Sequence, residues 1–337
     1  MRVAVVMGGR SSEHEISLAS ARSVLEALDR DRYDAVTVEI GRDGRWQLAP
    51  GGHAELAPAE ASALPVPMKE SPPAALADVD VVFPILHGPF GEDGTVQGLL
   101  ELANVPYVGA GVAASALCMD KDLFKALMRD KGVPVTRSVT LREGEGVSNP
   151  FGYPVFVKPA RLGSSVGVSK AQTRAELERG VALAFEHDDK VLVEEFVDGV
   201  EVECSVLGNR DPIASLPGEI VAHGFAGADW YDYSAKYDEG GMDLVVPPRL
   251  PETTIERVRA LAVESYVAAD CEGMARVDLF VRDGDVLVNE LNTIPGFTST
   301  SVYAKLFEAS GLPYAELLDR LVELALERHE RRARLRY

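Results

Sequence analysis

Short apolar runs alternate with segments of helical periodicity along the first third of the chain. Apolar runs bounded by glycine or proline are typical of buried strands, and strands separated by helices indicate a largely parallel sheet. Pro50 to Pro73 is rich in alanine and proline without a clear period, so we expect a surface excursion there. The pattern predicts an α/β layer at the N-terminus. Its expected strands are Arg2 to Met7, Ala35 to Ile40, Val79 to Leu86 and Val105 to Val108, and its expected helices are His14 to Leu28, Gly94 to Ala103 and Ser115 to Arg129.

The pattern changes from Tyr153 onward, where strands follow one another more closely. A capping box, Thr173-x-x-Glu176, predicts the start of a helix among these strands. This mixture is typical of an α+β fold. The other expected elements are strands Tyr153 to Lys158, Val166 to Lys170 and Val191 to Val197, the meander Val202 to Val221, a polar aromatic loop from Ala222 to Asp243, the helix Glu252 to Ala269, the hairpin Met274 to Asn292, and helices Ser301 to Ala309 and Pro313 to Glu330.

The composition narrows the class of protein. A length of 337 residues predicts two or three domains, and a chain with 46% hydrophobic and 26% charged residues is an ordinary globular protein, not a disordered or fibrous one. The formal net charge of −19 disfavours nucleic acid and anionic membranes as partners, because the field of the whole molecule repels polyanions. Any phosphate-bearing ligand must therefore meet a local cluster of positive charge.

The cysteines and the apolar stretches predict a cytoplasmic protein. Cys118, Cys204 and Cys271 are odd in number and have no CxxC spacing, so we expect reduced core residues. The apolar run Val3 to Met7 is too short for a signal peptide, and the uncharged stretch Leu102 to Met119 is interrupted by proline and glycine. Neither stretch predicts export or a membrane span.

Oxygen-bearing side chains gather on the two strands of the hairpin Met274 to Asn292. Strand alternation puts Arg276 and Asp278 on one face of the first strand, and Glu290 and Asn292 on one face of the second. Two carboxylates and an amide oxygen suit Mg²⁺, which prefers hard oxygen ligands. The alternative is the solvated outer face of an antiparallel hairpin.

The register of this hairpin distinguishes the two interpretations. A two-residue Asp283-Gly284 turn would by itself pair Asp278 with Asn289 and send Glu290 to the opposite face. A three-residue loop or a bulge would instead pair Asp278 with Glu290. The metal site therefore predicts a three-residue loop or a bulge.

Two loops are candidates for binding an anion. The segment Thr293 to Ser301 leads into a helix and offers free backbone N–H groups and hydroxyls, which can hold a carboxylate or a phosphate. A plain turn with a helix cap is the alternative. Lys158 ends a strand and precedes the Gly/Ser loop Gly163 to Gly167, an arrangement that could clamp a phosphate. This loop is not a Walker A motif, since the sequence contains no GxxxxGK[ST].

Two lysines and one strand are further candidates for a nucleotide site. Lys121 and Lys236 lie next to acidic residues in a chain poor in lysine, so each is either a phosphate ligand or half of a surface ion pair. The strand Val191 to Val197 ends in paired acids and is followed by Glu201. It could frame an adenine with backbone groups and bind ribose through a carboxylate, or it could be an exposed edge strand guarded by charge.

Glu13 and His87 each follow a predicted strand of the N-terminal sheet. Open α/β sheets bind ligands at the carboxyl ends of their strands, which makes both residues ligand candidates rather than surface residues. Gly109-Ala110-Gly111 imitates a dinucleotide-binding turn. No strand that ends in an acid follows at the required distance, so a nicotinamide cofactor is not expected.

Taken together, these segments resemble the D-alanine–D-alanine ligases of the ATP-grasp superfamily. The matching motifs occur in order from residue 8 to residue 301 and cover most of the chain. They are Gly8-Gly-x-Ser-x-Glu13-x-Glu-x-Ser, Leu86-His87-Gly-x-x-Gly-Glu-Asp-Gly, Ala116-Leu-x-Met-Asp-Lys121, Val157-Lys158-Pro-x-x-x-Gly-Ser164-Ser-Val-Gly, Tyr231-Asp-Tyr-x-Ala-Lys236-Tyr237, Arg276-x-Asp278 and Glu290-x-Asn292-Thr-x-Pro-Gly.

The resemblance implies a fold and an activity. The fold would be an N-terminal Rossmann-like parallel-sheet domain (residues 1–110), a central ATP-grasp subdomain (111–195) and a C-terminal ATP-grasp subdomain (196–337) with a lid loop and a metal site. The activity would be ATP-dependent ligation of two D-alanines through an acyl phosphate, for peptidoglycan precursors. ATP and two Mg²⁺ ions would be required, with Mn²⁺ as a substitute, and the protein would be a homodimer.

The resemblance also implies roles for the nucleotide and metal residues. Phosphates would be bound by Lys121, Lys158 and Lys236, adenine by Glu194, Glu195, Phe196 and Val197, ribose by Glu201, and the two Mg²⁺ ions by Asp278, Glu290 and Asn292.

The remaining implied roles concern the amino-acid substrates. Glu13 would receive the ammonium of the first D-alanine, with His87 beside that substrate, and Ser301 would hold the carboxylate of the second. The developing oxyanion would face Arg276 and the Gly296 amide. A closing network would join Glu13 to Ser164 and to Tyr237 on the lid.

Tyr237 separates the dipeptide ligases from their nearest alternative. Relatives that make D-alanine–D-lactate lack a tyrosine at this lid position, so the resemblance favours the dipeptide. A more remote alternative is another ATP-grasp ligase that joins a carboxylate to an amine. The rival classes are a NAD-linked dehydrogenase and a two-lobed small-molecule binding protein, and neither needs the metal hairpin or the separated lysines.

Overall fold

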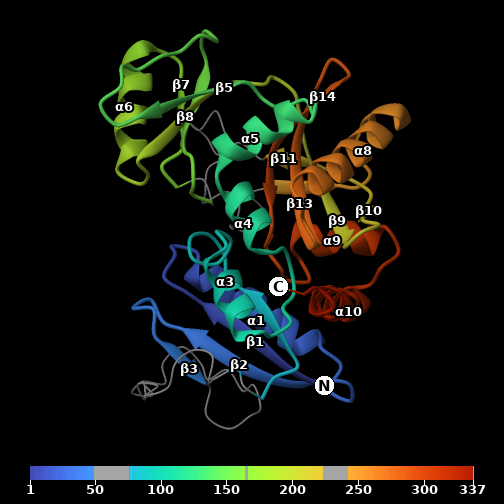
Figure 1. Cartoon of the computed structure of the whole chain (residues 1–337). Coiled ribbons are helices and arrows are strands. Elements are labelled where there is room, and N and C mark those ends of the chain that lie inside the picture. The colour runs from blue at the N-terminus through green and yellow to red at the C-terminus, as the bar shows by residue number, and fades with distance from the viewer. Residues whose placement is uncertain (49–75, 77, 164–165, 223–241, 337) are drawn as a thin grey trace.

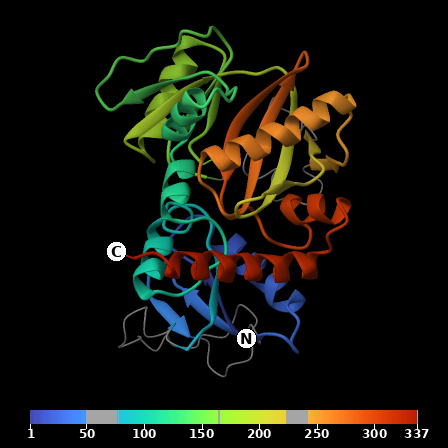
Figure 2. The same cartoon turned by 45° about the vertical axis from the view of Figure 1, so that its right-hand side comes forward.

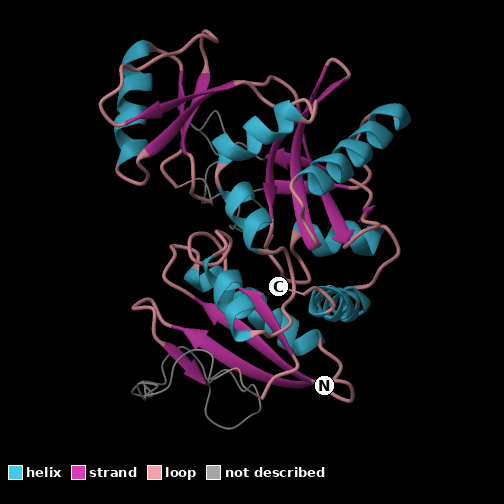
Figure 3. Cartoon of the chain, viewed as in Figure 1, coloured by secondary structure: helices cyan, strands magenta, loops and turns pink. Residues whose placement is uncertain are grey.

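The computed structural model describes residues 1–48, 76, 78–163, 166–222 and 242–336 (Figure 1). The expected excursion Pro50 to Pro73 lies outside the described residues, as does nearly all of the expected loop Ala222 to Asp243. The strands of the described part gather in three separate sheets, which Figure 3 shows in magenta. None of its helices combines the length and the apolar character that are needed to cross a bilayer.

The N-terminal sheet has the strand order β3-β2-β1-β4. The inner strand β1 (Arg2–Gly8) pairs in parallel with β2 (Asp34–Ile40) and with β4 (Val81–Ile85), and β3 (Trp46–Leu48) is an antiparallel edge. Residues 81–85 are all buried, as strands of a parallel sheet are when helices cover both faces. The largely parallel α/β layer expected from the sequence is confirmed.

Alternate residues of β1 face two different helical layers. Val3 and Val5 belong to a core shared with α1 (His14–Ala27) and α10 (Tyr314–Ala333), whereas Ala4 packs in a second core with α3 (Thr95–Ala103). Helices therefore cover both faces of the sheet, and a ligand can bind only at the loops along its carboxyl edge.

The prediction of a single helix from Ser115 to Arg129 is wrong, because two helices occupy this region. They are α4 (Val112–Met119) and α5 (Lys121–Asp130), separated at Asp120. Asp120 has an extended backbone, and its carboxylate accepts a hydrogen bond from Leu123 N at 3.1 Å. An aspartate that caps a new helix in this way satisfies one of the free N–H groups and favours the break.

The central sheet has the order β5-β8-β6-β7 and is antiparallel throughout. The expected strands and the helix α6 (Arg174–Phe185) are present, and the Thr173 hydroxyl caps the helix by accepting from Glu176 N at 3.3 Å. An edge strand that the sequence did not predict completes the sheet. The strands are β5 (Ser138–Arg142), β6 (Val155–Pro159), β7 (Ser169–Ala171) and β8 (Lys190–Glu195).

The C-terminal sheet is antiparallel, with the order β12-β11-β9-β13-β14 and β10 paired to β9. Helix α8 (Glu252–Ala268) packs on one face, where Val258, Leu261 and Tyr266 are fully buried. The strands are β9 (Val200–Gly208), β10 (Ile213–Ala214), β11 (Gly218–Ala222), β12 (Met242–Val245), β13 (Gly273–Arg282) and β14 (Asp285–Asn292).

The last two helices join the C-terminal sheet to the N-terminal domain. Helix α10 runs between the two, as the red helix of Figure 2 shows, and α9 (Val302–Ala309) lies against β9. Leu317 and Leu321 of α10 share one core with Val3 and Val5 of β1. The loop that follows β14 is therefore held beside the carboxyl edge of the N-terminal sheet.

Candidate active site

The hairpin β13-β14 contains the bulge that a metal site predicts. Asp278 is the partner of Glu290, whereas Leu279 is the partner of Val288, so Asn289 is the extra residue. A bulge of this kind turns the residues that follow it to the other face of the strand. The confirmed register brings the two carboxylates onto one face of the sheet.

The turn of the hairpin makes the bulge necessary. Asp283 and Gly284 connect the strands as a two-residue turn, and both have positive φ (53° and 89°). Asp-Gly favours this tight turn, because its two central residues must adopt the left-handed region. Without the extra residue in β14, Glu290 would point away from Asp278.

A cavity of about 370 Å³ lies where the three sheets meet. Most of the residues predicted for nucleotide, metal and substrate line it: Glu13, His87, Lys121, Lys158, Glu194, Glu195, Phe196, Val197, Glu201, Arg276, Asp278, Glu290, Asn292 and Gly296. Ser301 does not line the cavity, although a Cβ on Gly296 would lie 3.3 Å from its Oγ. Ser164, Lys236 and Tyr237 lie outside the described residues.

Two of the predicted phosphate-binding lysines reach the cavity from different elements. Lys121, at the start of α5, lies 3.1 Å from Glu290 and donates to Leu162 O at 2.9 Å. Lys158, near the end of β6, lies 2.7 Å from Glu194 on the neighbouring strand β8. These are ion pairs of the cavity wall, not of the outer surface, since both ammonium groups are largely buried.

A third lysine, Lys125, belongs to the same charge cluster and was not predicted. Its ammonium is completely buried and lies 2.7 Å from Glu194, so this carboxylate sits between Lys125 and Lys158. Burial disfavours the carboxylate, but the two ammonium groups outweigh burial and lower the pKa of Glu194 to about 2. The Glu194 side chain therefore holds Lys158.

Arg276 is buried between two carboxylates of the C-terminal sheet. It donates from Nε and Nη2 to the two oxygens of Asp278, each at 2.7 Å, and its Nε lies 3.0 Å from Glu203. Burial disfavours the cation, yet both carboxylates raise the pKa of Arg276 well above its usual value. Glu203 was not predicted, although it lies two residues beyond Glu201 on β9 and opposite Asp278 on β13.

The predicted metal ligands supply hard oxygen atoms at one place. Asn292 donates to Asp278 at 3.0 Å, and the buried Oδ1 of Asn289 at the bulge has no hydrogen-bond partner. An unpartnered buried acceptor beside two carboxylates fits the shell of Mg²⁺, which is commonly completed by water and phosphate. Among the described residues, no group of three or more His, Cys, Asp or Glu side chains is placed to hold a metal ion.

The N-terminal wall of the cavity carries Glu13 and His87. Both are buried, and the His87 ring lies 3.0 Å from Ile294 O through Nδ1 and 3.3 Å from Ser20 Oγ through Nε2. Burial lowers the pKa of His87, which keeps the ring neutral at pH 7. The histidine therefore connects the N-terminal domain to the loop after β14.

Glu92 is a second connection that was not predicted as a site residue, although it lies in the same motif as His87. Its carboxylate accepts from Gly88 N at 2.8 Å and from Ile294 N at 3.0 Å. Burial, followed by the charge of Glu13, raises the pKa of Glu92 to about 8. Both backbone groups of Ile294 are thus held by the loop after β4.

Glu92→Gln is expected to change how stability depends on pH. Between the ordinary pKa of 4.5 and the raised pKa of about 8, the folded chain holds a proton on Glu92 that the unfolded chain has lost. The free energy of unfolding that this group contributes therefore falls as pH rises through that window. Glutamine does not titrate, so the stability of the variant relative to wild type should increase from pH 5 to pH 8.

Urea unfolding of the ligand-free protein at several pH values measures this difference. Glu15→Gln is the matched control, because the Glu15 side chain is 74% exposed in its pair with Arg42. Parallel curves for wild type and the Glu92 variant would contradict the raised pKa.

Comparison with known proteins covers nearly the whole chain. The family model described as D-ala D-ala ligase N-terminus matches residues 2–110, and the one described as D-ala D-ala ligase C-terminus matches residues 127–323. The D-alanine–D-alanine ligase of Solibacter usitatus is 46% identical, with 100% of this chain and 99% of the relative covered. D-alanine–D-alanine ligase A of Salmonella typhimurium is 44% identical, with 98% and 96% covered.

Solved structures agree in fold over a similar span. The D-alanine-D-alanine ligase from Coxiella burnetii is 36% identical with a TM-score of 0.82, covering 99% of this chain and 97% of that one. The VanG D-Ala:D-Ser ligase from Enterococcus faecalis is 37% identical with a TM-score of 0.84, covering 96% and 99%. The Bacillus anthracis D-alanine–D-alanine ligase complexed with ATP is 28% identical with a TM-score of 0.78, covering 98% and 99%.

Proposed function

Because the chain belongs to the D-alanine–D-alanine ligase family of the ATP-grasp superfamily, we propose that it joins two D-alanines to D-alanyl-D-alanine for peptidoglycan synthesis, with ATP as the energy source. The observation that carries this function is the bulged hairpin, which directs Asp278 and Glu290 into the cavity that Lys121 and Lys158 also line. Positive and negative groups in one cavity suit a nucleotide with its metal ions. Neither a dehydrogenase nor a simple binding protein needs this combination.

The lysines would hold the phosphates of ATP. Lys121 and Lys158 approach the cavity from α5 and β6, and Lys236 is proposed as the third lysine. The base would lie along β8 near Phe196 and Val197, with Glu201 toward the ribose. This clustering explains how a chain with a net charge of −19 accepts a nucleotide, since the lysines act at short range.

Two divalent ions, Mg²⁺ or Mn²⁺, would be held by Asp278, Glu290 and Asn292. Bound there, they would neutralise the charge that spreads over the transferred phosphoryl group. Asp278 also pairs with Arg276. When Asp278 binds a metal ion, Glu203 would remain as the ion-pair partner of Arg276.

The reaction would begin at the first D-alanine. Glu13 would receive its ammonium and His87 would lie beside it, which directs its carboxylate toward the γ-phosphate. A carboxylate oxygen attacks the γ-phosphorus, and the bond between this phosphorus and the β–γ bridging oxygen breaks. ADP is the leaving group, and the first D-alanine becomes an acyl phosphate. This activation is needed because a free carboxylate is a poor acyl donor.

The second D-alanine would then complete the bond. Its amine, after losing a proton, attacks the acyl carbon, and phosphate leaves as the peptide bond forms. Ser301 would hold its carboxylate, while Arg276 and the Gly296 amide stabilise the oxyanion. Ser164 and Tyr237 would close the site with Glu13 and exclude the water that would hydrolyse the acyl phosphate. A homodimer and a cytoplasmic location remain predictions.

Phosphate release from ATP and Mg²⁺ tests the function. We expect release with D-alanine, and only background release with L-alanine or without an amino acid. Equal release in all three mixtures would reject the ligase. Adding D-lactate or D-serine to D-alanine at neutral pH tests the second substrate, and preferential formation of the mixed product would reject D-alanine in that position.

A further inference from the structure

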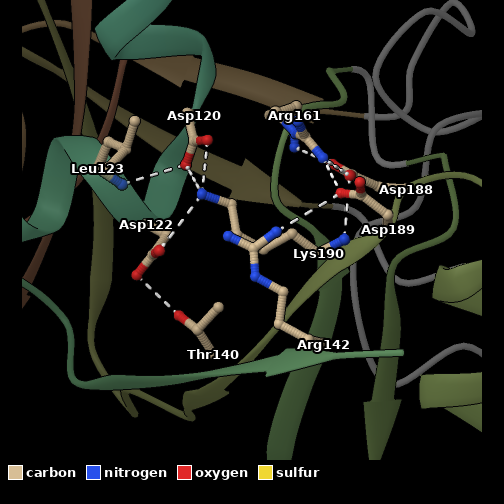
Figure 4. Close-up of polar contacts among 9 residues, drawn as sticks. All are labelled: Asp120, Asp122, Leu123, Thr140, Arg142, Arg161, Asp188, Asp189 and Lys190. Carbon is tan, nitrogen blue, oxygen red and sulfur yellow. Dashed lines mark hydrogen bonds and ion pairs between the residues drawn. The ribbon is translucent and has the colours of Figure 1, made fainter. Parts of the chain in front are cut away.

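A buried lysine outside the cavity joins the start of α5 to the central sheet, close to Lys121. Lys190, the first residue of β8, is 3% exposed and lies 2.6 Å from both oxygens of Asp120 and 3.3 Å from Asp122 (Figure 4). Asp120 and Asp122 flank Lys121 at the N-terminal end of α5. One buried ammonium thus makes three charge-assisted contacts with two carboxylates, an arrangement that is costly to break by removing one partner.

The backbone joins the same two segments. Lys121 N donates to Ala160 O at 3.0 Å, and Ala160 N donates to Lys190 O at 2.9 Å. The Lys121 ammonium donates to Leu162 O, two residues further along. The start of α5, the segment after β6 and the start of β8 therefore form one junction, which includes the buried Lys190 side chain.

The two sides of this junction belong to different packing units. Phe124 and Met128 of α5 are buried in the core of the C-terminal sheet, whereas Val191 and Val193 of β8 are buried in the core of the central sheet. Lys190 therefore bridges the two sheets that enclose the cavity. Movement of one sheet against the other would move the Lys121 ammonium relative to Lys158.

Other cations near the junction have partners of their own. Arg161 pairs with Asp188 and with Asp189, and Arg142 lies 3.9 Å from Asp189 (Figure 4). The Arg142 and Arg161 side chains are 57% and 44% exposed, whereas the Lys190 side chain is buried. The Lys190 ammonium is therefore the most deeply buried cation at this junction, and it contacts the two aspartates that flank Lys121.

We propose that Lys190 is a positioning residue that fixes Lys121 for phosphate binding by clamping the N-terminus of α5 to the central sheet. The proposal rests on the proposed function, in which Lys121 binds ATP. A small displacement of the Lys121 ammonium would weaken its contact with a phosphate of bound ATP. Loss of Lys190 should therefore weaken ATP binding while leaving the site of D-alanine, on the N-terminal wall, unchanged.

Lys190→Met tests this proposal through ATP–Mg²⁺ binding by calorimetry and through steady-state kinetics. We expect the Kd and the KM for ATP to rise about tenfold, equivalent to ~1.4 kcal/mol, with the KM for D-alanine unchanged. Lys190→Arg, which can form a two-bond pair with Asp120, should restore most of the affinity. Arg142→Met is the matched control and should bind ATP like wild type.

A second variant removes the Asp120 charge that Lys190→Met leaves without its partner. Asp120→Asn/Lys190→Met keeps a helix cap, because asparagine also caps well, but lacks the ion pair. The double variant should fold and still show the raised Kd for ATP. A lower melting temperature with an unchanged Kd in either variant would overturn the proposal, whereas wild type without D-alanine-dependent ATP consumption would reject the proposed function itself.

Discussion

Replacing Arg276 by alanine is expected to lower kcat by about 10²- to 10³-fold, the usual effect of removing one oxyanion donor, while the Kd for ATP changes little. The guanidinium is buried against Asp278 and Glu203 at the edge of the cavity, where a low dielectric strengthens its field. Its proposed role appears as the tetrahedral oxyanion forms, so its loss should affect turnover more than binding. Dipeptide formation measures kcat, and calorimetry measures the Kd.

The alanine variant leaves two carboxylates without their cation, which could also destabilise the fold. Removing one partner of a buried ion pair costs about 3–5 kcal/mol. Arg276→Lys therefore serves as the companion variant, since lysine keeps the charge but cannot reproduce the two-bond contact with Asp278. Its melting temperature should stay near that of wild type while kcat falls. Equal losses of ATP affinity and turnover in both variants would contradict a role in the transition state.

Replacing Glu194 by glutamine is expected to lower the free energy of unfolding by about 3–5 kcal/mol at pH 7. Glu194 is the shared partner of Lys125 and Lys158, and the change leaves two buried ammonium groups without a countercharge. ATP affinity should fall as well, because Lys158 loses the group that holds it. Urea unfolding and calorimetric titration with ATP–Mg²⁺ measure the two effects.

The pH dependence of the Glu194 effect has a defined sign. The folded pKa of about 2 lies below the ordinary value of 4.5, so the stability from this group is complete above pH 4.5 and is lost as pH falls toward 2. The difference between wild type and Glu194→Gln should shrink over that range. Glu178→Gln, in an exposed pair with Arg174, is the matched control and should show almost no difference at any pH. A constant difference would contradict the lowered pKa.

The hairpin shows how far sequence reasoning can reach. Alternation identified the face that carries Arg276, Asp278, Glu290 and Asn292, and the need to pair the two carboxylates limited the connection to a longer loop or a bulge. The choice between these depended on local chemistry. Asp283-Gly284 closes the tight turn, so the extra residue lies inside β14.

Periodicity could not reveal the groups that support the site. Lys125 lies on the buried face of the amphipathic helix α5, which packs with the C-terminal sheet, and only the tertiary fold brings its ammonium to Glu194 of the central sheet. Glu203 and Glu92 likewise find their partners across strands or domains. Such contacts arise from tertiary structure, and the spacing of residues within one segment does not predict them.

Two of the errors in element prediction have local causes. The apolar and charged residues around Asp120 continue a helical period, so the break was hidden although aspartate is a good cap. The missed strand β5 (Ser138–Arg142) lies at the edge of its sheet with Leu141 as its one buried residue, and it therefore lacks the alternation of a half-buried strand.

The fate of the carboxylate oxygen of the first D-alanine tests the central claim most directly. D-alanine labelled with oxygen-18 in its carboxylate is incubated with the protein, ATP and Mg²⁺, and the phosphate is examined by mass spectrometry. Attack of the carboxylate on the γ-phosphate predicts one labelled oxygen in phosphate for each D-alanyl-D-alanine formed, with ADP as the other product. Unlabelled phosphate, or AMP and pyrophosphate in place of ADP, would contradict the account.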